Sequence, residues 1–167
     1  MRSIEIRRFD PATIADFRAI RLAALKEAPQ AFGSTYEVEA TRPLAAFAER
    51  VDGSTVLGAY AGQDVVGMAG FRREDGAKHG HKGFVWGMYV KPHVRGDGVG
   101  TLLVEALLLA AAGVVEQLTL TVVSENHAAI ALYRKFGFEV YGVEPRALKQ
   151  PEGYSDEVLM VRFLATG

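Results

Sequence analysis

The sequence predicts a mixed α/β fold in which helices flank a central, twisted mixed β-sheet. Short apolar or β-branched segments of strand length alternate with segments whose apolar residues recur at helical spacing. Two strand–helix–strand units follow one another in the second half, and helical crossovers permit parallel pairing. The 167 residues, 49% of them hydrophobic and 23% charged, suit one globular domain spanning residues 1–167.

The N-terminal third is predicted to hold one strand and two helices. Residues 3–9 alternate apolar and polar side chains, as a half-buried strand does. The Asp10-Pro11 pair then supplies a helix N-cap and a proline at the first helical position, and an apolar stripe follows. Residues 29–42 have no clear period and are predicted to form a loop. Residues 43–51 suggest a short second helix.

Three strands are predicted next. Residues 55–61 and 64–73 are short apolar segments separated by Gly62-Gln63, which is the composition of a β-hairpin. Residues 81–91 follow a turn rich in glycine, histidine and lysine, and indicate another strand.

The remaining chain alternates helix and strand. Apolar residues at helical spacing begin at Val99 and run to Gly113, which can end the helix. Asn126 can cap a further helix, and Gly137 can close it. Strands are predicted at residues 117–123, 138–148 and 156–164. The predicted order is strand–helix–helix–strand–strand–strand–helix–strand–helix–strand–strand.

Charge and composition exclude several function classes. Nineteen Lys and Arg oppose twenty Asp and Glu, so no global field favours nucleic acid or an anionic membrane. The absence of cysteine excludes a disulfide framework, a Cys-ligated metal and a catalytic thiol. His79 and His81 lack a third ligand nearby, and we expect no metal site. No apolar leader or membrane-length stretch occurs, and we expect a cytoplasmic protein.

The segment VKPHVRGDGVGTLL, residues 90–103, carries the strongest chemical signal. A strand ends, a loop with three glycines follows, and an amphipathic helix begins. Glycine lets the backbone approach a ligand closely, and the free amides at a helix start favour phosphate. Arg95 could add a charged donor. The loop matches neither GxxxxGK[ST] nor GxGxxG, so it indicates another kind of pyrophosphate cradle; a glycine-rich turn before a helix is the alternative.

A second segment, SENHAAIALYRKFGFEVYG, places Asn126 and Tyr133 two helical turns apart, near one face. Taken singly, they could be an N-cap and a core residue. Together the two segments resemble the GNAT superfamily of acyl-CoA-dependent N-acetyltransferases, strongly over residues 84–142. The first motif is R/Q-x-x-G-x-G/A, and the second is N-x-x-A-x-x-L-Y-x-x-x-G-F. They are matched by Arg95, Gly98 and Gly100, and by Asn126, Ala129, Leu132, Tyr133, Gly137 and Phe138.

The resemblance implies acetyl-CoA as co-substrate and direct attack by a primary amine on its thioester. The loop that would hold the pyrophosphate is made of Arg95, Gly96, Asp97, Gly98, Val99 and Gly100, with Thr101 beginning the helix. The preceding strand would splay from its neighbour, and main-chain groups of Met88, Tyr89 and Val90 would contact the pantetheine arm. Asn126 would hydrogen-bond CoA, and Tyr133 would act as the general acid that protonates the leaving thiolate.

The general base is left open by the sequence. Thr121 stands where the ribosomal-protein branch of the family carries a glutamate on the strand before the asparagine, and a hydroxyl is a poor base. The candidates are Glu37 and Glu39 in the early loop, His81, Asp156 and Glu157. A solvated surface charge is the alternative for each of them.

The expected function is transfer of an acetyl group from acetyl-CoA to a primary amine of a small molecule. The alternatives are a protein or peptide acetyltransferase, acting on an N-terminus or on lysine, and a non-catalytic CoA-binding sensor. Trp86 and Tyr89, expected on alternate faces of their strand, are candidates for lining the acceptor pocket, together with Phe32, Tyr36 and Tyr154. Many relatives dimerise, so a homodimer is a further expectation.

Overall fold

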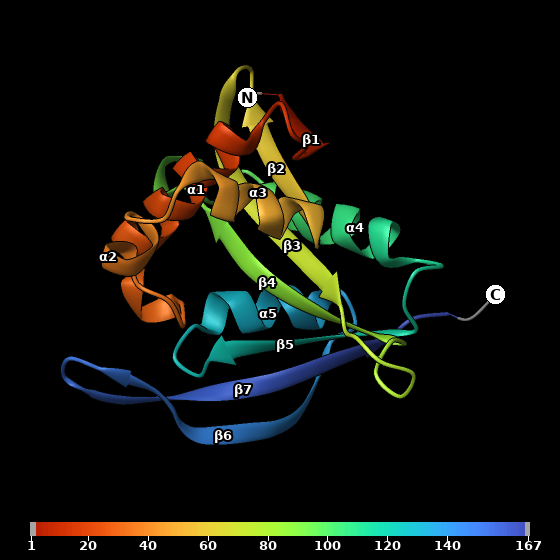
Figure 1. Cartoon of the computed structure of the whole chain (residues 1–167). Coiled ribbons are helices and arrows are strands. Elements are labelled where there is room, and N and C mark those ends of the chain that lie inside the picture. The colour runs from red at the N-terminus through yellow and green to blue at the C-terminus, as the bar shows by residue number, and fades with distance from the viewer. Residues whose placement is uncertain (1–2, 166–167) are drawn as a thin grey trace. The chain divides into compact units, whose positions relative to one another are not determined.

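The computed structural model describes residues 3–165, and Figure 1 labels their elements. The strands are β1 (Ile4–Arg8), β2 (Thr55–Ala61), β3 (Asp64–Arg73), β4 (Lys82–Val90), β5 (Gln117–Val123), β6 (Glu139–Gln150) and β7 (Gly153–Phe163). The α-helices are α1 (Ile14–Glu27), α2 (Tyr36–Glu39), α3 (Leu44–Asp52), α4 (Val99–Ala111) and α5 (His127–Lys135). The mixed α/β fold is confirmed, with strand order β1-β2-β3-β4-β5-β7-β6 in one sheet.

The chain divides into two compact units, and strand β4 contributes to both. The first unit comprises the described residues up to Arg72 together with Val85–Ala110. The second comprises Arg73–Phe84 together with the described residues from Ala111 onward. A single domain over residues 1–167 stays a prediction.

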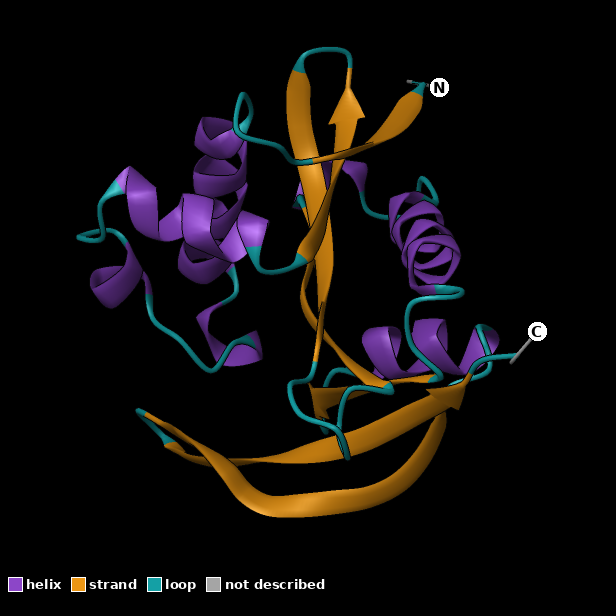
Figure 2. Ribbon diagram, turned by 45° about the vertical axis from the view of Figure 1, so that its right-hand side comes forward, coloured by secondary structure: helices purple, strands orange, loops and turns teal. Residues whose placement is uncertain are grey.

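In the first unit, antiparallel strands separate two groups of helices. β1 pairs with β2 from Ile4↔Ala61 to Arg8↔Leu57. β2 turns into β3 at Gly62, whose φ of 65° is the left-handed conformation that such a tight turn needs. The predicted hairpin is therefore confirmed. Figure 2 shows α1 and α3 on one side of these strands and α4 on the other.

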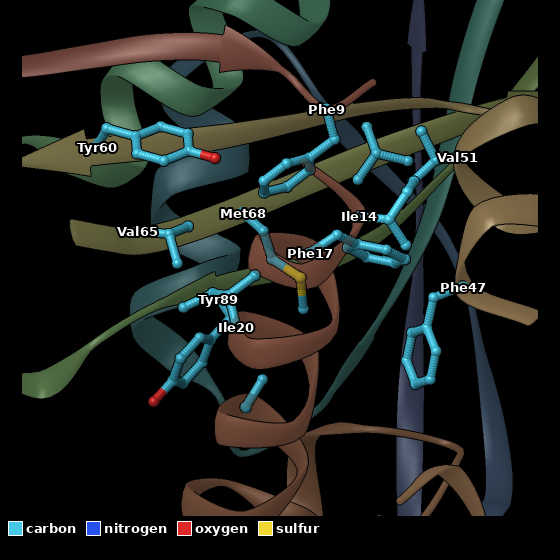
Figure 3. Packing of buried hydrophobic residues seen from close by; sticks show 12 residues of the cluster. Phe9, Ile14, Phe17, Ile20, Phe47, Val51, Tyr60, Val65, Met68 and Tyr89 are labelled. Carbon is cyan, nitrogen blue, oxygen red and sulfur yellow. The ribbon is translucent and has the colours of Figure 1, made fainter. Parts of the chain in front are cut away.

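The core of the first unit lies between its strands and helices α1 and α3 (Figure 3). Phe17 and Ile20 of α1 and Met68 of β3 have no exposed surface. The Phe17 ring packs against the rings of Phe9 and Phe47, at centroid distances of 5.6 and 5.9 Å. Full burial of one such side chain is worth about 1.5–3 kcal/mol, so these contacts hold both helices on the sheet.

Helix α1 begins later than the Asp10-Pro11 pair predicts. Its N-cap residue is Thr13, so the assignment of Asp10 as N-cap is wrong. The Asp10 carboxylate instead accepts hydrogen bonds from the Ala12 amide at 2.8 Å and from the Thr13 hydroxyl at 3.2 Å. Asp10 thereby stabilises the turn before the helix rather than the helix itself.

Residues 29–42, predicted to be a loop, contain the short helix α2. The Thr35 hydroxyl caps it by accepting a hydrogen bond from the Val38 amide at 3.4 Å. Its last residue, Glu39, is only 1% exposed although it carries a carboxylate. The partners that make this burial tolerable come from α1 and α3, which is why local sequence did not reveal the helix.

An ion-pair triad joins α1, α2 and α3. Arg21 donates from Nε and Nη2 to the two carboxylate oxygens of Glu39, at 3.0 and 2.9 Å. Arg50 donates from Nη1 to the same carboxylate at 3.0 Å. Burial alone would raise the pKa of Glu39, but the hydrogen bonds and charges of its partners hold that pKa at about 2.

Replacing Glu39 with glutamine should lower the free energy of unfolding by about 3–5 kcal/mol, because it leaves a buried guanidinium unpaired. The folded pKa of about 2 lies below the unfolded value of about 4.3. The carboxylate's contribution is therefore complete above pH ~5 and is lost as the pH falls towards 2. Urea unfolding across this range should show the difference from wild type shrinking. The exposed Glu37 of the same helix is the control, and equal losses for both variants would contradict the role of the triad.

In the second unit, β5 has a parallel and an antiparallel neighbour. The first residues of β4 run parallel to it, from Lys82↔Gln117 to Phe84↔Thr119. β7 runs antiparallel to it along its whole length, and β6 pairs with the far side of β7. Because β7 lies between β5 and β6, the crossover through α5 does not join neighbouring parallel strands. β6 and β7 are also longer than predicted, and they form one hairpin.

Helix α5 covers one face of β5 and β7, and Figures 1 and 2 both show it running along β5. Leu118, Leu120 and Met160 on that face are at most 2% exposed. Just after the helix, a Cβ placed on Gly137 would lie 3.0 Å from Nε of Arg162, the ladder partner of Leu118. The opposite face of β5 and β7, which includes Thr121, Leu159 and Glu157, is not covered by α5.

Candidate active site

The glycine-rich loop of the first unit turns β4 into α4. Gly96 and Gly98 have φ angles of 88° and 82°, which side chains with a Cβ rarely adopt. A Cβ at either position would meet no atom within 4 Å, so the loop faces open space. The Leu102 amide makes the first helical bond, to the Gly98 carbonyl at 3.1 Å. The amides of Val99, Gly100 and Thr101 precede that bond, where a helix offers free donors to an anion.

Arg95, the predicted charged donor, is already bonded within the first unit. Its Nε donates to the Val90 carbonyl at 2.9 Å, and its Nη2 pairs with the Glu27 carboxylate at 3.0 Å. Its guanidinium also lies 5.9 Å from the centre of the Tyr89 ring. The anion-binding capacity of the loop thus rests on its main-chain amides. Glu27 was not singled out in the sequence because it lies 68 residues away.

In the second unit, Asn126 and Tyr133 occupy the two ends of α5. The Asn126 side chain accepts the Ala129 amide at 3.2 Å, which confirms the predicted cap and leaves its NH₂ group free. Tyr133 is 5% exposed and packs edge-on against Phe138 at 5.4 Å. Its hydroxyl has no hydrogen-bond partner among residues 3–165. Burial raises the pKa of Tyr133, so the phenol stays protonated at neutral pH.

A model of the acetyltransferase (GNAT) family matches residues 21–138, which include the loop, Asn126 and Tyr133. The chain belongs to the GNAT family. Peptidyl-lysine N-acetyltransferase YjaB of Salmonella typhimurium is 42% identical over 55 residues, 33% of this chain and 35% of YjaB. The chain spans about a third of the length of the curated relatives it matches.

Solved GNAT structures share the fold over nearly the whole chain. A ribosomal-protein-alanine N-acetyltransferase from Brucella melitensis is 26% identical, with a TM-score of 0.82 over 96% of this chain and 99% of that one. The yncA protein of Salmonella typhimurium, solved with its cofactor acetyl-CoA, is 24% identical with a TM-score of 0.84. That likeness covers 99% of this chain and 96% of yncA.

The end of β4, from Met88 to Val90, is the segment that the GNAT resemblance assigns to pantetheine. These three residues belong to the first unit. A Cβ on Gly67 of β3 would lie 2.9 Å from the Tyr89 carbonyl oxygen, so glycine allows this close approach.

The prediction that Trp86 and Tyr89 lie on alternate faces of β4 is wrong. Gly87 has a φ of 72°, which breaks the regular alternation of the strand. Both aromatic rings therefore pack against the same core, Trp86 at 6.0 Å from Phe17 and Tyr89 at 6.5 Å from Phe32. Nε1 of Trp86 is buried, and no residue of the described chain accepts its proton. Burial, followed by the nearby Glu27, raises the pKa of Tyr89 to about 12.

Two of the five candidate bases are committed elsewhere. Glu39 holds two arginines and stays ionised to very low pH, which makes it a poor proton acceptor. It is buried and paired, neither in a loop nor solvated. The Asp156 carboxylate accepts the Arg146 amide at 2.8 Å, where φ of 53° at Arg146 marks a bulge of β6. Glu37 is exposed. His81 is half-buried and directly precedes β4.

Glu157 stands apart from the other candidates. Burial and the charge of Glu144 raise its pKa, while a hydrogen bond from Thr121 acts in the opposite direction. The three residues share the second unit. Thr121 stands at the position of the glutamate of the ribosomal-protein branch and cannot take over its role as a base. It is, however, a neighbour of a different glutamate, Glu157.

Two further properties concern metals and membranes. Over residues 3–165, no three His, Asp or Glu side chains gather as a metal ion would require. Within the same residues, no helix is long and apolar enough to span a bilayer.

Proposed function

We propose that this protein is an N-acetyltransferase that moves an acetyl group from acetyl-CoA to a primary amine. One observation carries the proposal: the glycine-rich loop presents two left-handed glycines and the free amides of Val99, Gly100 and Thr101 at the start of an α-helix. Open space at both glycines and the positive end of the helix fit a pyrophosphate. Membership of the GNAT family supports the same assignment.

In this proposal, each predicted residue keeps one task. The amides of Gly96 and of Gly98 to Thr101 bind pyrophosphate, whereas the Asp97 amide already donates to the Val94 carbonyl at 3.2 Å. Main-chain groups of Met88, Tyr89 and Val90 hold the pantetheine arm. The Val90 carbonyl already accepts a hydrogen bond from Arg95, so Val90 would contribute its amide. One β4 amide stabilises the oxyanion of the tetrahedral intermediate. Asn126 uses its free NH₂ group to bind CoA.

Tyr133 acts as the general acid in this scheme. Acetyl-CoA supplies the acetyl group as an activated thioester. The acceptor nitrogen forms a bond to the carbonyl carbon, and the carbon–sulfur bond breaks. Tyr133 gives its phenolic proton to the departing thiolate, and the proton lost as the amide forms restores the phenol. The hydroxyl is unpartnered among the described residues, and burial keeps the phenol protonated at neutral pH, so its proton is available for this role.

We propose a small-molecule primary amine as the acceptor and the cytoplasm as the location. A lysine side chain of a protein is the second candidate, favoured by the 42% identity to a peptidyl-lysine N-acetyltransferase. A CoA-binding sensor without turnover is the third, and the free Tyr133 hydroxyl argues against it.

Release of free CoA from acetyl-CoA across a panel of amines tests the proposal. The panel holds polyamines, amino acids, aminoglycosides, arylalkylamines, and peptides with a free N-terminus or an internal lysine. We expect turnover with a small amine. Turnover with lysine peptides alone would move the assignment to protein acetylation. Tight acetyl-CoA binding without turnover would support the sensor, and absence of binding would overturn the proposal.

A further inference from the structure

The face of β5 and β7 opposite α5 is half-open and carries one charged side chain from these two strands. Residues paired across a ladder point to the same side, so Thr121 and Leu159 share this face with Glu157. Among the described residues that β5 and β7 place there, Glu157 alone is charged. It is half-buried beside Val123, its buried ladder partner on β5.

Glu157 has a defined neighbour on each side. On β5, Thr121 is its diagonal neighbour across the ladder, and the Thr121 hydroxyl favours the ionised carboxylate and so lowers the pKa of Glu157. On β6, Glu144 is its direct ladder partner, with the two like charges facing one another. Glu139 shares that face of β6 but lies opposite Val161, four residues along β7. Glu144 is therefore the one titratable side chain of β6 placed directly against Glu157.

These neighbours give the carboxylate the properties of a proton acceptor. Partial burial and Glu144 both raise the pKa of Glu157 and favour proton uptake. Thr121 acts in the opposite direction and favours the ionised form of the carboxylate, which is the form that can accept a proton. No arginine or lysine pairs with it among residues 3–165, in contrast to Glu39, which two arginines hold.

We propose that Glu157 is the general base that deprotonates the acceptor amine, with Thr121 as its positioning residue. This inference rests on the proposed function. An alkylammonium ion has a pKa of about 10.4, so only about one molecule in a thousand is a free amine at neutral pH. Glu157 takes one proton from the ammonium nitrogen and passes it to water. The nitrogen then attacks the thioester carbon, and the second proton balances the one that Tyr133 gives to sulfur.

The placement of the two groups supports separate tasks. Tyr133 lies on α5, on one face of β5, and Glu157 lies on the other face. In this proposal the base serves the incoming amine and the acid serves the leaving thiolate, and neither passes a proton directly to the other.

The pH dependence of kcat/KM, measured with the best acceptor of the amine panel, tests the proposal. Glu157→Gln should lower kcat by about 10²–10⁴-fold and remove the acidic limb of the profile. Glu157→Asp should retain the acidic limb with reduced kcat.

The two neighbours of Glu157 should shift the acidic limb in opposite directions. Glu144→Gln removes a like charge, so the acidic limb should move to lower pH. Thr121→Val removes a hydrogen bond to the ionised form, so the limb should move to higher pH. Glu139→Gln is the control and should leave the profile unchanged.

Two kinds of failure are distinguishable. A wild-type protein that transfers acetyl groups, combined with a fully active Glu157→Gln variant of unchanged profile, would overturn Glu157 as the base and leave the transferase assignment intact. A wild-type protein without activity towards any amine would remove the proposed function itself. Opposite shifts for Glu144→Gln and Thr121→Val would support the proposal, because a purely structural role moves neither limb.

Discussion

Replacing Tyr133 with phenylalanine is expected to lower kcat by about 10²–10⁴-fold while leaving the affinity for acetyl-CoA nearly unchanged. The substitution removes only the phenolic O–H, and losing a general acid typically costs this much. The hydroxyl has no partner within residues 3–165, so no buried group loses a hydrogen bond. Steady-state kinetics together with calorimetric titration of acetyl-CoA would separate the two effects.

Tyr141→Phe is a suitable control for Tyr133→Phe. Tyr141 is exposed on β6, so its loss should leave both parameters as in wild type. Unchanged turnover of Tyr133→Phe would mean that water or another group protonates the thiolate. A large loss of acetyl-CoA affinity would instead give Tyr133 a binding role.

Replacing Gly98 with valine is expected to abolish acetyl-CoA binding. Its φ of 82° is strained for any residue with a Cβ and most of all for a β-branched one. Relaxing that strain turns the loop amides away from the pyrophosphate, and the new side chain fills the open space that the phosphate needs. The dissociation constant for acetyl-CoA, measured by calorimetry, reports the effect directly.

Gly113→Val provides a matched control for the backbone strain. Gly113 has a φ of 78°, and a Cβ there also meets nothing within 4 Å, but the residue follows the other end of α4. Both variants should lose comparable stability, and Gly113→Val alone should keep its affinity for acetyl-CoA. Retained affinity in Gly98→Val would show that this loop is not the cradle.

Local patterns predicted most of the fold because most elements are specified by their own residues. The strand at 117–123 and the helix between Asn126 and Gly137 follow from β-branched composition, an N-cap and a left-handed glycine. Helix α2 was missed because its formation depends on two arginines from other helices. The shared face of Trp86 and Tyr89 was missed because one positive φ, at Gly87, reverses the alternation of the strand.

The candidate site was predicted unevenly, for the same physical reason. The loop glycines, Asn126 and Tyr133 form motifs that are short in sequence. The environments of Arg95 and Glu157 depend on residues far along the chain, namely Glu27 for the first and Thr121 and Glu144 for the second. Sequence spacing therefore named the groups that would bind CoA more readily than the group that would take the proton.

The close approach of Gly67 to Tyr89 has a consequence for how this chain can diverge. The atom that would meet a Cβ there, at 2.9 Å, belongs to the main chain of β4, so no change of side chain elsewhere can make room. Gly142 differs, because its nearest neighbour is a side-chain carbon of Leu159 at 3.5 Å. Descendants of this sequence can therefore acquire a methyl group at position 142 by ordinary drift. At position 67 they can do so only by moving the strand on which the thioester would rest.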